Sequence, residues 1–496
     1  MSRAECTASD FSKSRCAIFM TNSKPQEHLL IRGLGLWAAA ALGVCDIVGQ
    51  GVFLKARAMT CNVGAPWLVM TAWVLAGLLA LCGALTLAEL GAMMPESGGP
   101  YAFLRRAFSP QIGFAYGWMM LFLGAPLSAA ALAAGGAIFL NLQTGGALSA
   151  IRLPFALGSA HGNLAGTQLV ALALIAAIAV INLAPVRTNG AIATALAGVK
   201  ILMLVLLTIG AFMLGSGSFN HFAMNGSAGL CAGIAASARG GAAGFGAAMI
   251  GALYAYQGWS SLTYVAGEVK EPSRTLPLAL VATMLVVIAL YVAANAAYFY
   301  VLTPFQIAST SPASSVGLEV LGHVFGAPAR GLGTALLFVS VLATLHVTIL
   351  TNSRITFALA DDDNLVPWLA QVSSRARVPS RAVILAAAMA AILVVLGTFD
   401  VLSDFEIFSV WIFYGLVGLS LFVLRRKEPD APRPYRIAGY PWIPAAFLAA
   451  TAWLLFEAVI DAPARSLLGL GIIALSLPVY RLLKARKTRR ATTAPA

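Results

Sequence analysis

The stretch that decides the fold is "VCDIVGQGVFLKA", residues 44 to 56, where Gly49, Gln50 and Gly51 interrupt an otherwise apolar run and Asp46 precedes them. A helix in a lipid bilayer must pair its own backbone groups, because no water is present to do so. Glycine between polar residues at that depth favours an unwound segment that lines an internal cavity. Glycine also serves close helix packing, so this segment alone leaves both interpretations open.

The composition is that of an integral membrane protein. Of the 496 residues, 59% are hydrophobic and 10% are charged, and the mean hydropathy is +0.85. The net charge of +13 does not indicate nucleic-acid binding, because the basic residues separate apolar runs rather than cluster on one face. Residues 1–33 lack the features of a secretory signal, so we expect a retained N-terminal tail.

Apolar runs of about 18 residues or more predict twelve membrane-spanning helices. We expect them at approximately 34–54, 66–94, 111–142, 166–185, 189–215, 243–265, 276–303, 331–359, 382–399, 404–424, 441–460 and 466–482. Because backbone groups at membrane depth must be paired internally, the predicted fold class is an all-α bundle.

The basic residues predict the orientation of the chain. The loops after odd-numbered spans contain only Lys55, Arg57, Arg152, Arg239, Arg330 and Arg465, whereas both tails and the other loops are richer in lysine and arginine. By the positive-inside rule, we expect both termini to be cytoplasmic.

A second interruption lies in the predicted sixth span, where "YAYQGWSS", residues 254–261, places Gly258 among polar side chains. The first and sixth spans are corresponding positions in an arrangement of five plus five helices. Paired interruptions of this kind indicate a transporter built from inverted repeats, with its binding site near the bilayer midplane.

These segments resemble a known family. "VGQGVF" (48–53) resembles the GSG(I/V)F motif of the amino acid, polyamine and organocation (APC) transporter superfamily, and "YAYQGWSSLTYVAGEVKEPSRTLP" (254–277) is similar to the span-6 signature of its L-type amino acid transporter branch. "AELGAMMPESGGPYAFLRRAF" (88–108), "TNSRITFALADDDNLVP" (351–367) and "LRRKEPDAPRPYRIAGYPWIP" (424–444) match further family stretches in the same order.

The resemblance implies a LeuT-like fold with broken first and sixth helices and two peripheral helices at the end. The expected divisions are a cytoplasmic tail (1–33), a first repeat (34–215), a second repeat with its preceding outer loop (216–424), an inner loop with the last two spans (425–482) and a basic cytoplasmic tail (483–496).

An amino acid carries a carboxylate and an ammonium group whatever its side chain. The amides of Gln50, Gly51 and Val52 suit the carboxylate, and carbonyl groups near Cys45 to Val48 and Tyr254 to Ala255 suit the ammonium. The candidate substrate-binding residues are Cys45, Asp46, Ile47, Gly49, Gln50, Gly51, Tyr254, Ala255, Gln257, Gly258, Trp259, Thr344, His346 and Phe408. For His346, Phe408 and Trp411, simple packing is the competing interpretation.

Two charged residues inside predicted spans are candidates for coupling. Asp46, where relatives usually carry a neutral residue, could recognise a cationic group, take part in proton coupling or form a structural ion pair, for which Lys200 is the candidate partner. The resemblance places Lys200 on span 5, facing the unwound part of span 1. It could carry a proton or serve as a fixed cationic tether.

Two further residues are candidate gates. Tyr254 matches an aromatic residue that covers the substrate from the outside in relatives. Glu89 lies toward the cytoplasmic end of span 2, where a structural role in closing the inner end is expected.

The six cysteines show no metal-ligand spacing, and no metal site or cofactor is predicted. Cys61 and Cys231 fall in predicted outer loops and form a disulfide if that side is oxidising. Relatives that pair with a heavy chain use a cysteine in the loop after span 3. Residues 143–165 contain none, so a disulfide-linked heavy chain is not expected.

The predicted function is secondary transport of amino acids across the cell membrane by alternating access, as proton-coupled symport. The alternatives are an amino acid exchanger and a carrier of polyamines or other organic cations that uses Asp46. A transporter fold used as a nutrient sensor would keep the same site. An enzyme is not expected, since the five histidines are dispersed and no catalytic motif occurs.

Overall fold

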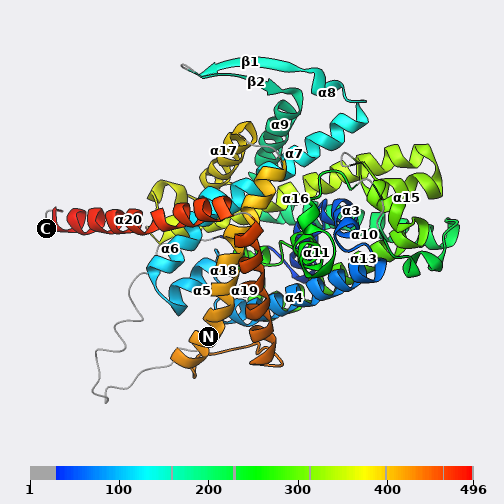
Figure 1. Cartoon of the computed structure of the whole chain (residues 1–496). Coiled ribbons are helices and arrows are strands. Elements are labelled where there is room, and N and C mark those ends of the chain that lie inside the picture. Colours follow the sequence, from blue (N-terminus) through cyan, green and yellow to red (C-terminus); the bar gives the residue numbers. More distant parts are fainter. Residues whose placement is uncertain are drawn as a thin grey trace.

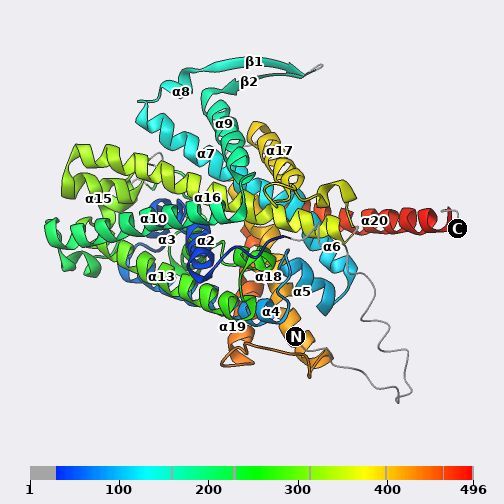
Figure 2. The same ribbon diagram turned by 180° about the vertical axis from the view of Figure 1, so that it is seen from behind.

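The computed structural model describes residues 30–157, 160–226, 229, 231–311, 314–362, 364–396, 399–461 and 463–493. Long helices pack side by side in a bundle, and the C-terminal part of the last helix extends beyond it (Figures 1 and 2). Cys6, Cys16 and all but the end of the predicted N-terminal tail lie outside the described residues.

The long helices follow one another through the whole described chain. They are α2 (Leu36–Ile47), α3 (Gly51–Val63), α4 (Pro66–Met93), α6 (Pro110–Met119), α7 (Ala125–Gln143), α9 (Gly166–Asn182), α10 (Val186–Leu214), α11 (Gly241–Ala255), α13 (Pro272–Val301), α16 (Ala327–Asp361), α17 (Ser380–Leu396), α18 (Phe399–Lys427), α19 (Trp442–Asp461) and α20 (Pro463–Thr493). Short helices are α5 (Pro100–Ala107), α8 (Ala147–Ala150), α12 (Ser261–Tyr264), α14 (Pro304–Ser309) and α15 (Val316–Phe325), with 3₁₀ turns η3 (Phe219–Ala223), η4 (Ala236–Ala238), η5 (Ala266–Glu268) and η6 (Pro367–Ala370) and a π-helical turn η2 (Met120–Gly124).

Glycine and proline set several of these boundaries. Gly64 ends α3 in the left-handed conformation, with φ of 70°, and Pro66 begins α4 two residues later. This short turn makes α3 and α4 consecutive neighbours in the bundle.

In the described chain, eight helices are long and apolar enough to cross a membrane, or nine when the bent pair α2 and α3 counts as one span. They correspond to nine of the twelve predicted spans. The other three predicted spans, the fourth, sixth and ninth, coincide with the shorter apolar helices α9, α11 and α17. The chain is therefore a predominantly helical, multi-pass membrane protein.

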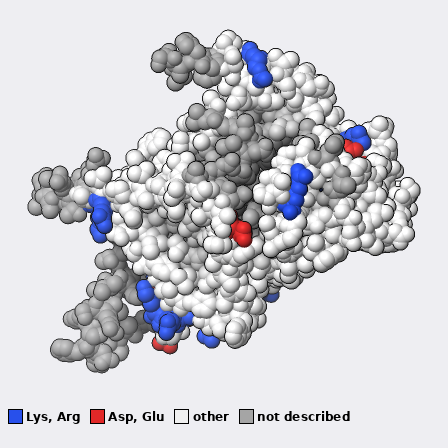
Figure 3. All heavy atoms as spheres, viewed as in Figure 1, with Lys and Arg blue, Asp and Glu red and all other residues white. Residues whose placement is uncertain are grey.

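The lipid-facing surface is apolar. On α10, large apolar side chains including Leu202, Leu206 and Met213 are exposed, and Leu278 and Leu285 are exposed on α13. Uncharged residues also cover most of the described face seen in Figure 3. Such a surface is stable where the surrounding solvent is lipid.

The interior and the rim of the bundle are formed by different helices. Within their most apolar windows, 67% of the residues of α16 and 78% of those in the run from α6 to α7 are buried, against 22% for α19 and for α20. The last two helices thus lie at the periphery.

The prediction of an all-α fold was wrong in one respect. Strands β1 (Arg152–Leu157) and β2 (Ala160–Ala165) pair antiparallel, with Arg152 opposite Ala165, and project from the bundle beyond α8 and α9 (Figure 1). The hairpin falls in a loop between two spans, where the periodicity of the membrane helices carries no information.

Candidate functional site

The first interruption lies between α2 and α3. α2 ends at Ile47, α3 begins at Gly51, and the two helices are bent by 40° at this break. Within the described chain, the backbone amides of Gln50, Gly51 and Val52 donate no hydrogen bond. Unpaired amides at the positive end of a helix dipole suit an anion such as a carboxylate.

The second interruption lies between α11 and α12. Gly258 has a φ of 115°, which side-chain-bearing residues rarely adopt. A Cβ atom there would lie 3.1 Å from both the backbone carbon and the carboxylate Oδ2 of Asp46. Glycine therefore allows this turn and its close approach to the end of α2.

The two interruptions also touch directly. A Cβ atom on Gly51 would lie 2.6 Å from the Cβ and 2.7 Å from the Cα of Ala255. Since Ala255 is the last residue of α11, the start of α3 packs against the end of α11 with no room for a side chain.

Replacing Gly51 with alanine is expected to separate the two breaks. The new methyl group meets backbone atoms that cannot rotate away, so we expect a loss of roughly 1–3 kcal/mol in the free energy of unfolding and slower substrate uptake. Gly198, on α10, offers the matched control, because a Cβ there meets nothing within 4 Å. Equal thermal stability and uptake for Gly51→Ala and Gly198→Ala would contradict the close packing.

Lys200 holds the end of α2. Its Nζ donates to the carbonyl oxygens of Cys45 (2.7 Å) and Val48 (2.5 Å) and to Oγ1 of Thr344 (2.7 Å). The lysine is 1% exposed. These three contacts use all three N–H groups of the ammonium.

Tyr291, on α13, bridges the two breaks. Its hydroxyl oxygen lies 2.9 Å from the carbonyl oxygen of Ile47 and 3.1 Å from that of Ala255. Together with the two carbonyls held by Lys200, four carbonyl groups beside the breaks already have buried side-chain donors.

Asp46 does not form the ion pair with Lys200 that was one of the predicted alternatives. Its Oδ1 accepts a hydrogen bond from Oγ1 of Thr348, at 3.1 Å. No ion pair in the described chain uses this carboxylate.

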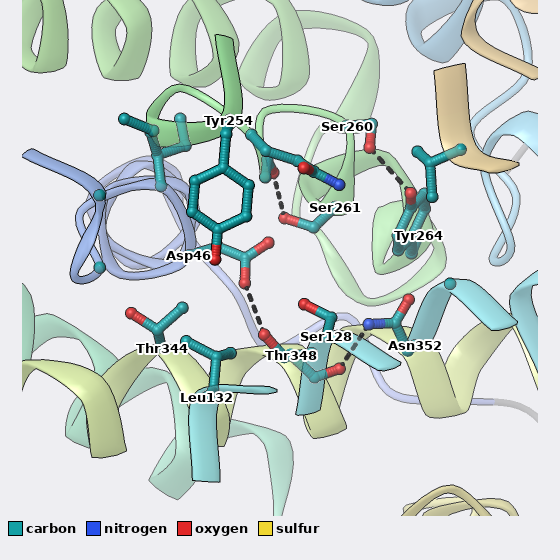
Figure 4. A pocket seen from close by; sticks show the side chains of 18 of the residues that line it. Asp46, Ser128, Leu132, Tyr254, Ser260, Ser261, Tyr264, Thr344, Thr348 and Asn352 are labelled. Atoms are coloured by element: carbon teal, nitrogen blue, oxygen red, sulfur yellow. Dashed lines mark hydrogen bonds between the residues drawn. The ribbon is translucent and has the colours of Figure 1, made fainter. Parts of the chain in front are cut away.

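A cavity opens where the breaks meet α7, α16 and α18 (Figure 4). Counted with its opening to solvent, it encloses about 750 Å³. It is lined by Asp46, Ile47, Gly49, Gln50, Gly51, Met120, Gly124, Ser128, Leu132, Tyr254, Ala255, Gln257, Gly258, Ser260, Ser261, Tyr264, Thr344, Thr348, Asn352, Val410 and Tyr414.

The family follows from a comparison with known proteins. The model of the amino acid permease family matches residues 34–468. The chain belongs to this family. The resemblance to the APC superfamily and its L-type branch is thus confirmed, as is the prediction of a transporter rather than an enzyme.

Several curated relatives align with nearly the whole permease. The serine/threonine exchanger SteT of Bacillus subtilis is 28% identical over 93% of this chain and 99% of its own length. The human b(0,+)-type amino acid transporter 1 is 26% identical, over 89% of this chain and 85% of its own. The rat large neutral amino acids transporter small subunit 2 is 27% identical, over 91% and 81%.

The structure of the permease brings ten of the fourteen predicted substrate-binding residues to the cavity. They are Asp46, Ile47, Gly49, Gln50, Gly51, Tyr254, Ala255, Gln257, Gly258 and Thr344. Lys200 contacts the unwound segment, as the resemblance implied, but lies behind it and does not line the cavity. Their roles in binding and coupling stay predictions.

The other four predicted residues, Cys45, Trp259, His346 and Phe408, do not line the cavity. The thiol of Cys45 lies 3.1 Å from the carbonyl oxygen of Ala193, on the far side of α2. The ring of Trp259 packs against the ring of Tyr414, with centroids 4.8 Å apart. The side chains of Cys45 and Trp259 point away from the cavity because of the helix rotation and the local unwinding. Sequence position alone does not specify that direction.

His346 and Phe408 pack between helices. His346 is 1% exposed, and its backbone carbonyl accepts a hydrogen bond from Asn182. A Cβ on Gly469 of α20 would lie 3.5 Å from Cδ1 of Phe408, so this ring faces the periphery. For His346 and Phe408, these positions agree better with packing between helices than with contact to a substrate in the cavity.

Sequence reasoning missed part of the cavity wall. Thr348 and Asn352 follow Thr344 at intervals of four residues on α16, a spacing that puts all three on one face of a helix and could have been used. Ser128 and Leu132, on α7, are also four residues apart, but a serine among apolar residues is common in membrane helices and gave no reason to choose that face.

Glu89 joins three segments at one end of the bundle, which we call the ion-pair end. Its Oε2 lies 2.6 Å from Nη2 of Arg425 and accepts the backbone amide of Ile437 at 2.8 Å. Beside it, Arg106 donates two hydrogen bonds to Glu428, which lower the pKa of that carboxyl. The position is compatible with the predicted structural role of Glu89 in gating.

A second ion pair at this end is fully enclosed. Nε of Arg354, on α16, lies 2.6 Å from Oε1 of Glu268 in η5, and neither side chain is exposed. The backbone carbonyl of Glu268 accepts the amides of Gly33 (2.9 Å) and Leu34 (3.0 Å). The chain before α2 is thereby attached to the segment after the second break.

The opposite end of the bundle, which we call the disulfide end, carries the Cys61–Cys231 disulfide. It connects the last turn of α3 with the loop that precedes α11. Arg57 donates to the carbonyl oxygen of Ala232 in that loop, at 2.7 Å. On the same helix, Nζ of Lys55 lies 4.6 Å from the ring centroid of Tyr254, the predicted gate.

Proposed function

We propose that this permease carries amino acids across the membrane by alternating access and binds them in the cavity between the two broken helices. The observation that carries the proposal is the meeting of the two breaks at Gly51 and Ala255, beside three unpaired amides. A substrate carboxylate would bind the amides of Gln50, Gly51 and Val52. Tyr254 would close the cavity from the disulfide end.

The architecture we propose has twelve spans, with 34–215 and 216–424 as inverted repeats and 425–482 as the peripheral part. The bent first span, the broken sixth helix and the peripheral positions of α19 and α20 support it. We further propose that the ion-pair end and both termini face the cytoplasm of a cell membrane, as the basic residues predict.

Two modes of coupling are proposed. Exchange of one amino acid for another is supported by the fixed position of Lys200 on three neutral oxygens and by a relative named an exchanger. Proton-coupled symport is supported by a lysine and an aspartate that lie at membrane depth on either side of α2.

The permease is proposed to act without a disulfide-linked heavy chain. The loop after the predicted third span contains no cysteine, and Cys61 is bonded to Cys231 within the chain.

Uptake into proteoliposomes tests the function and separates the coupling modes. We would offer a panel of radiolabelled amino acids and polyamines to vesicles that are empty, preloaded with amino acid or held under an inward proton gradient. Exchange requires preloading and ignores the gradient, whereas symport requires the gradient alone. Uptake of polyamines without any amino acid would favour the organic cation carrier, and no uptake under any condition would overturn the proposal of transport.

A further inference from the structure

The cavity contains a single charged side chain. All its other lining residues are neutral at pH 7, and the charged one is Asp46 (Figure 4). The figure shows the Asp46 carboxylate turned toward Thr348, with the hydrogen bond between them drawn as a dashed line. A carboxylate at membrane depth is costly unless a cation or several donors accompany it.

No ion pair in the described chain joins this carboxylate to a basic side chain. Lys200, which lies on the other side of α2, directs its three N–H groups at Cys45, Val48 and Thr344. The side chains that hydrogen-bond this carboxylate, Thr348 and Ser261, are neutral hydroxyls. A cation that enters the cavity would therefore find a carboxylate that no basic side chain contacts directly.

Four backbone carbonyls beside the breaks already take part in hydrogen bonds within the protein. Those of Cys45 and Val48 hold Lys200, and those of Ile47 and Ala255 share the hydroxyl of Tyr291. A carbonyl oxygen can accept more than one hydrogen bond, so the prediction that they receive a substrate ammonium stays open beside a role for Asp46.

Further hydrogen-bond acceptors line the same cavity as Asp46. One turn along α16 from Thr348, the amide Nδ2 of Asn352 donates to the carbonyl oxygen of Thr348 at 2.8 Å, which leaves its Oδ1 in the cavity wall. That buried Oδ1 has no hydrogen-bond partner in the described chain. An ammonium group has three N–H donors, and a carboxylate with an amide oxygen and a hydroxyl such as that of Ser128 would accept them.

We propose that Asp46 is the ion-pair partner of a primary ammonium group of the substrate. This inference rests on the proposed transport function and adds the group that the site selects. The ammonium can be the α-amino group of any amino acid or the side-chain amino group of a basic one. The chemistry is the same, and acetylation at one nitrogen or the other distinguishes the two.

The test combines one conservative variant with ligands that lose one charge at a time. Binding of L-serine, L-lysine, Nα-acetyl-L-serine, Nα-acetyl-L-lysine and Nε-acetyl-L-lysine would be measured on the purified full-length native protein and on Asp46→Asn. For the native protein, we expect acetylation of the recognised nitrogen to weaken binding by roughly tenfold or more. In Asp46→Asn, that difference should fall to about twofold or less, because the carboxylate charge that distinguishes an ammonium group from an acetylated nitrogen is gone.

The position at which the preference disappears identifies the source of the ammonium. Loss at the α-nitrogen of both amino acids assigns Asp46 to the common amino group, and loss at the ε-nitrogen alone assigns it to a basic side chain. Glu96→Gln, which removes an exposed carboxylate outside the cavity, is the matched control and should keep the native preferences. Each variant must elute as a folded, monodisperse protein before binding is measured. Asp46→Thr provides a second neutral replacement in case Asp46→Asn does not fold.

A preference for the free amine that persists unchanged in Asp46→Asn and Asp46→Thr would overturn the inference while leaving transport intact. Failure of the native protein to take up any amino acid in the uptake panel would instead remove the proposed function on which it rests.

Discussion

Lys200→Ala is expected to lower the initial rate of amino acid uptake by roughly 100-fold or more, because three buried oxygens lose their charged donor and the two carbonyls among them keep only the hydroxyls of Thr344 and Ser340. A hydrogen bond to a charged group contributes about 1.5–3 kcal/mol, and 1.4 kcal/mol corresponds to a factor of ten. Two of these acceptors are the carbonyls that define the break after α2. The measurement is uptake into proteoliposomes by each variant, at equal protein incorporation.

Two further variants make the result specific. Lys200→Arg keeps the positive charge but replaces the compact ammonium group by a planar guanidinium group. We therefore expect it to lose part of the uptake rate. Lys270→Ala removes an exposed lysine near the ion-pair end and should transport at the native rate. Native uptake by Lys200→Ala would show that the unwound segment does not depend on this lysine.

Glu268→Gln is expected to destabilise the folded protein by about 3–5 kcal/mol, because it leaves the charge of Arg354 buried and unpaired. Both side chains of this pair have zero exposure. The matched control is Glu96→Gln, which breaks the exposed contact with Arg105 and should cost about 1 kcal/mol or less. The unfolding temperatures of the two variants would be compared in detergent, with loss of the monodisperse elution peak as the measure of unfolding. Equal unfolding temperatures would contradict the enclosed pair.

Removing both partners separates stability from function. In Glu268→Leu combined with Arg354→Met, neither position carries a buried, unpaired charge, so most of the lost stability should return. The attachment of α16 to the segment after the second break would still be missing. We therefore expect a stable protein with altered transport, and a double variant as unstable as Glu268→Gln would argue against the ion pair as the cause.

Much of the bundle could be predicted from the sequence because a membrane-spanning helix requires a long run of apolar residues, which is easily recognised. The breaks at Gly49 to Gly51 and at Gly258 were also predictable, since the two glycine interruptions occupy corresponding positions in the first and sixth predicted spans. Their direct contact, from Gly51 to Ala255, agrees with the prediction that both belong to one site.

What the sequence could not provide is the rotation of individual side chains. Cys45 is the neighbour of Asp46, yet it faces Ala193 while Asp46 faces the cavity. Trp259 follows Gly258, yet it packs among aromatic rings. Within an unwound segment neither the helical nor the strand period applies, so adjacent residues cannot be assigned to faces from spacing.

The disulfide has a mechanical consequence. α3 and α11 touch at Gly51 and Ala255 near the middle of the bundle, and near the other end of α3 the Cys61–Cys231 bond ties that helix to the loop that leads into α11. The disulfide limits how far these two helices can separate at that end. In the proposed alternating access, opening of the cavity toward the disulfide end would therefore require α3 and α11 to tilt together, away from α7 and α16.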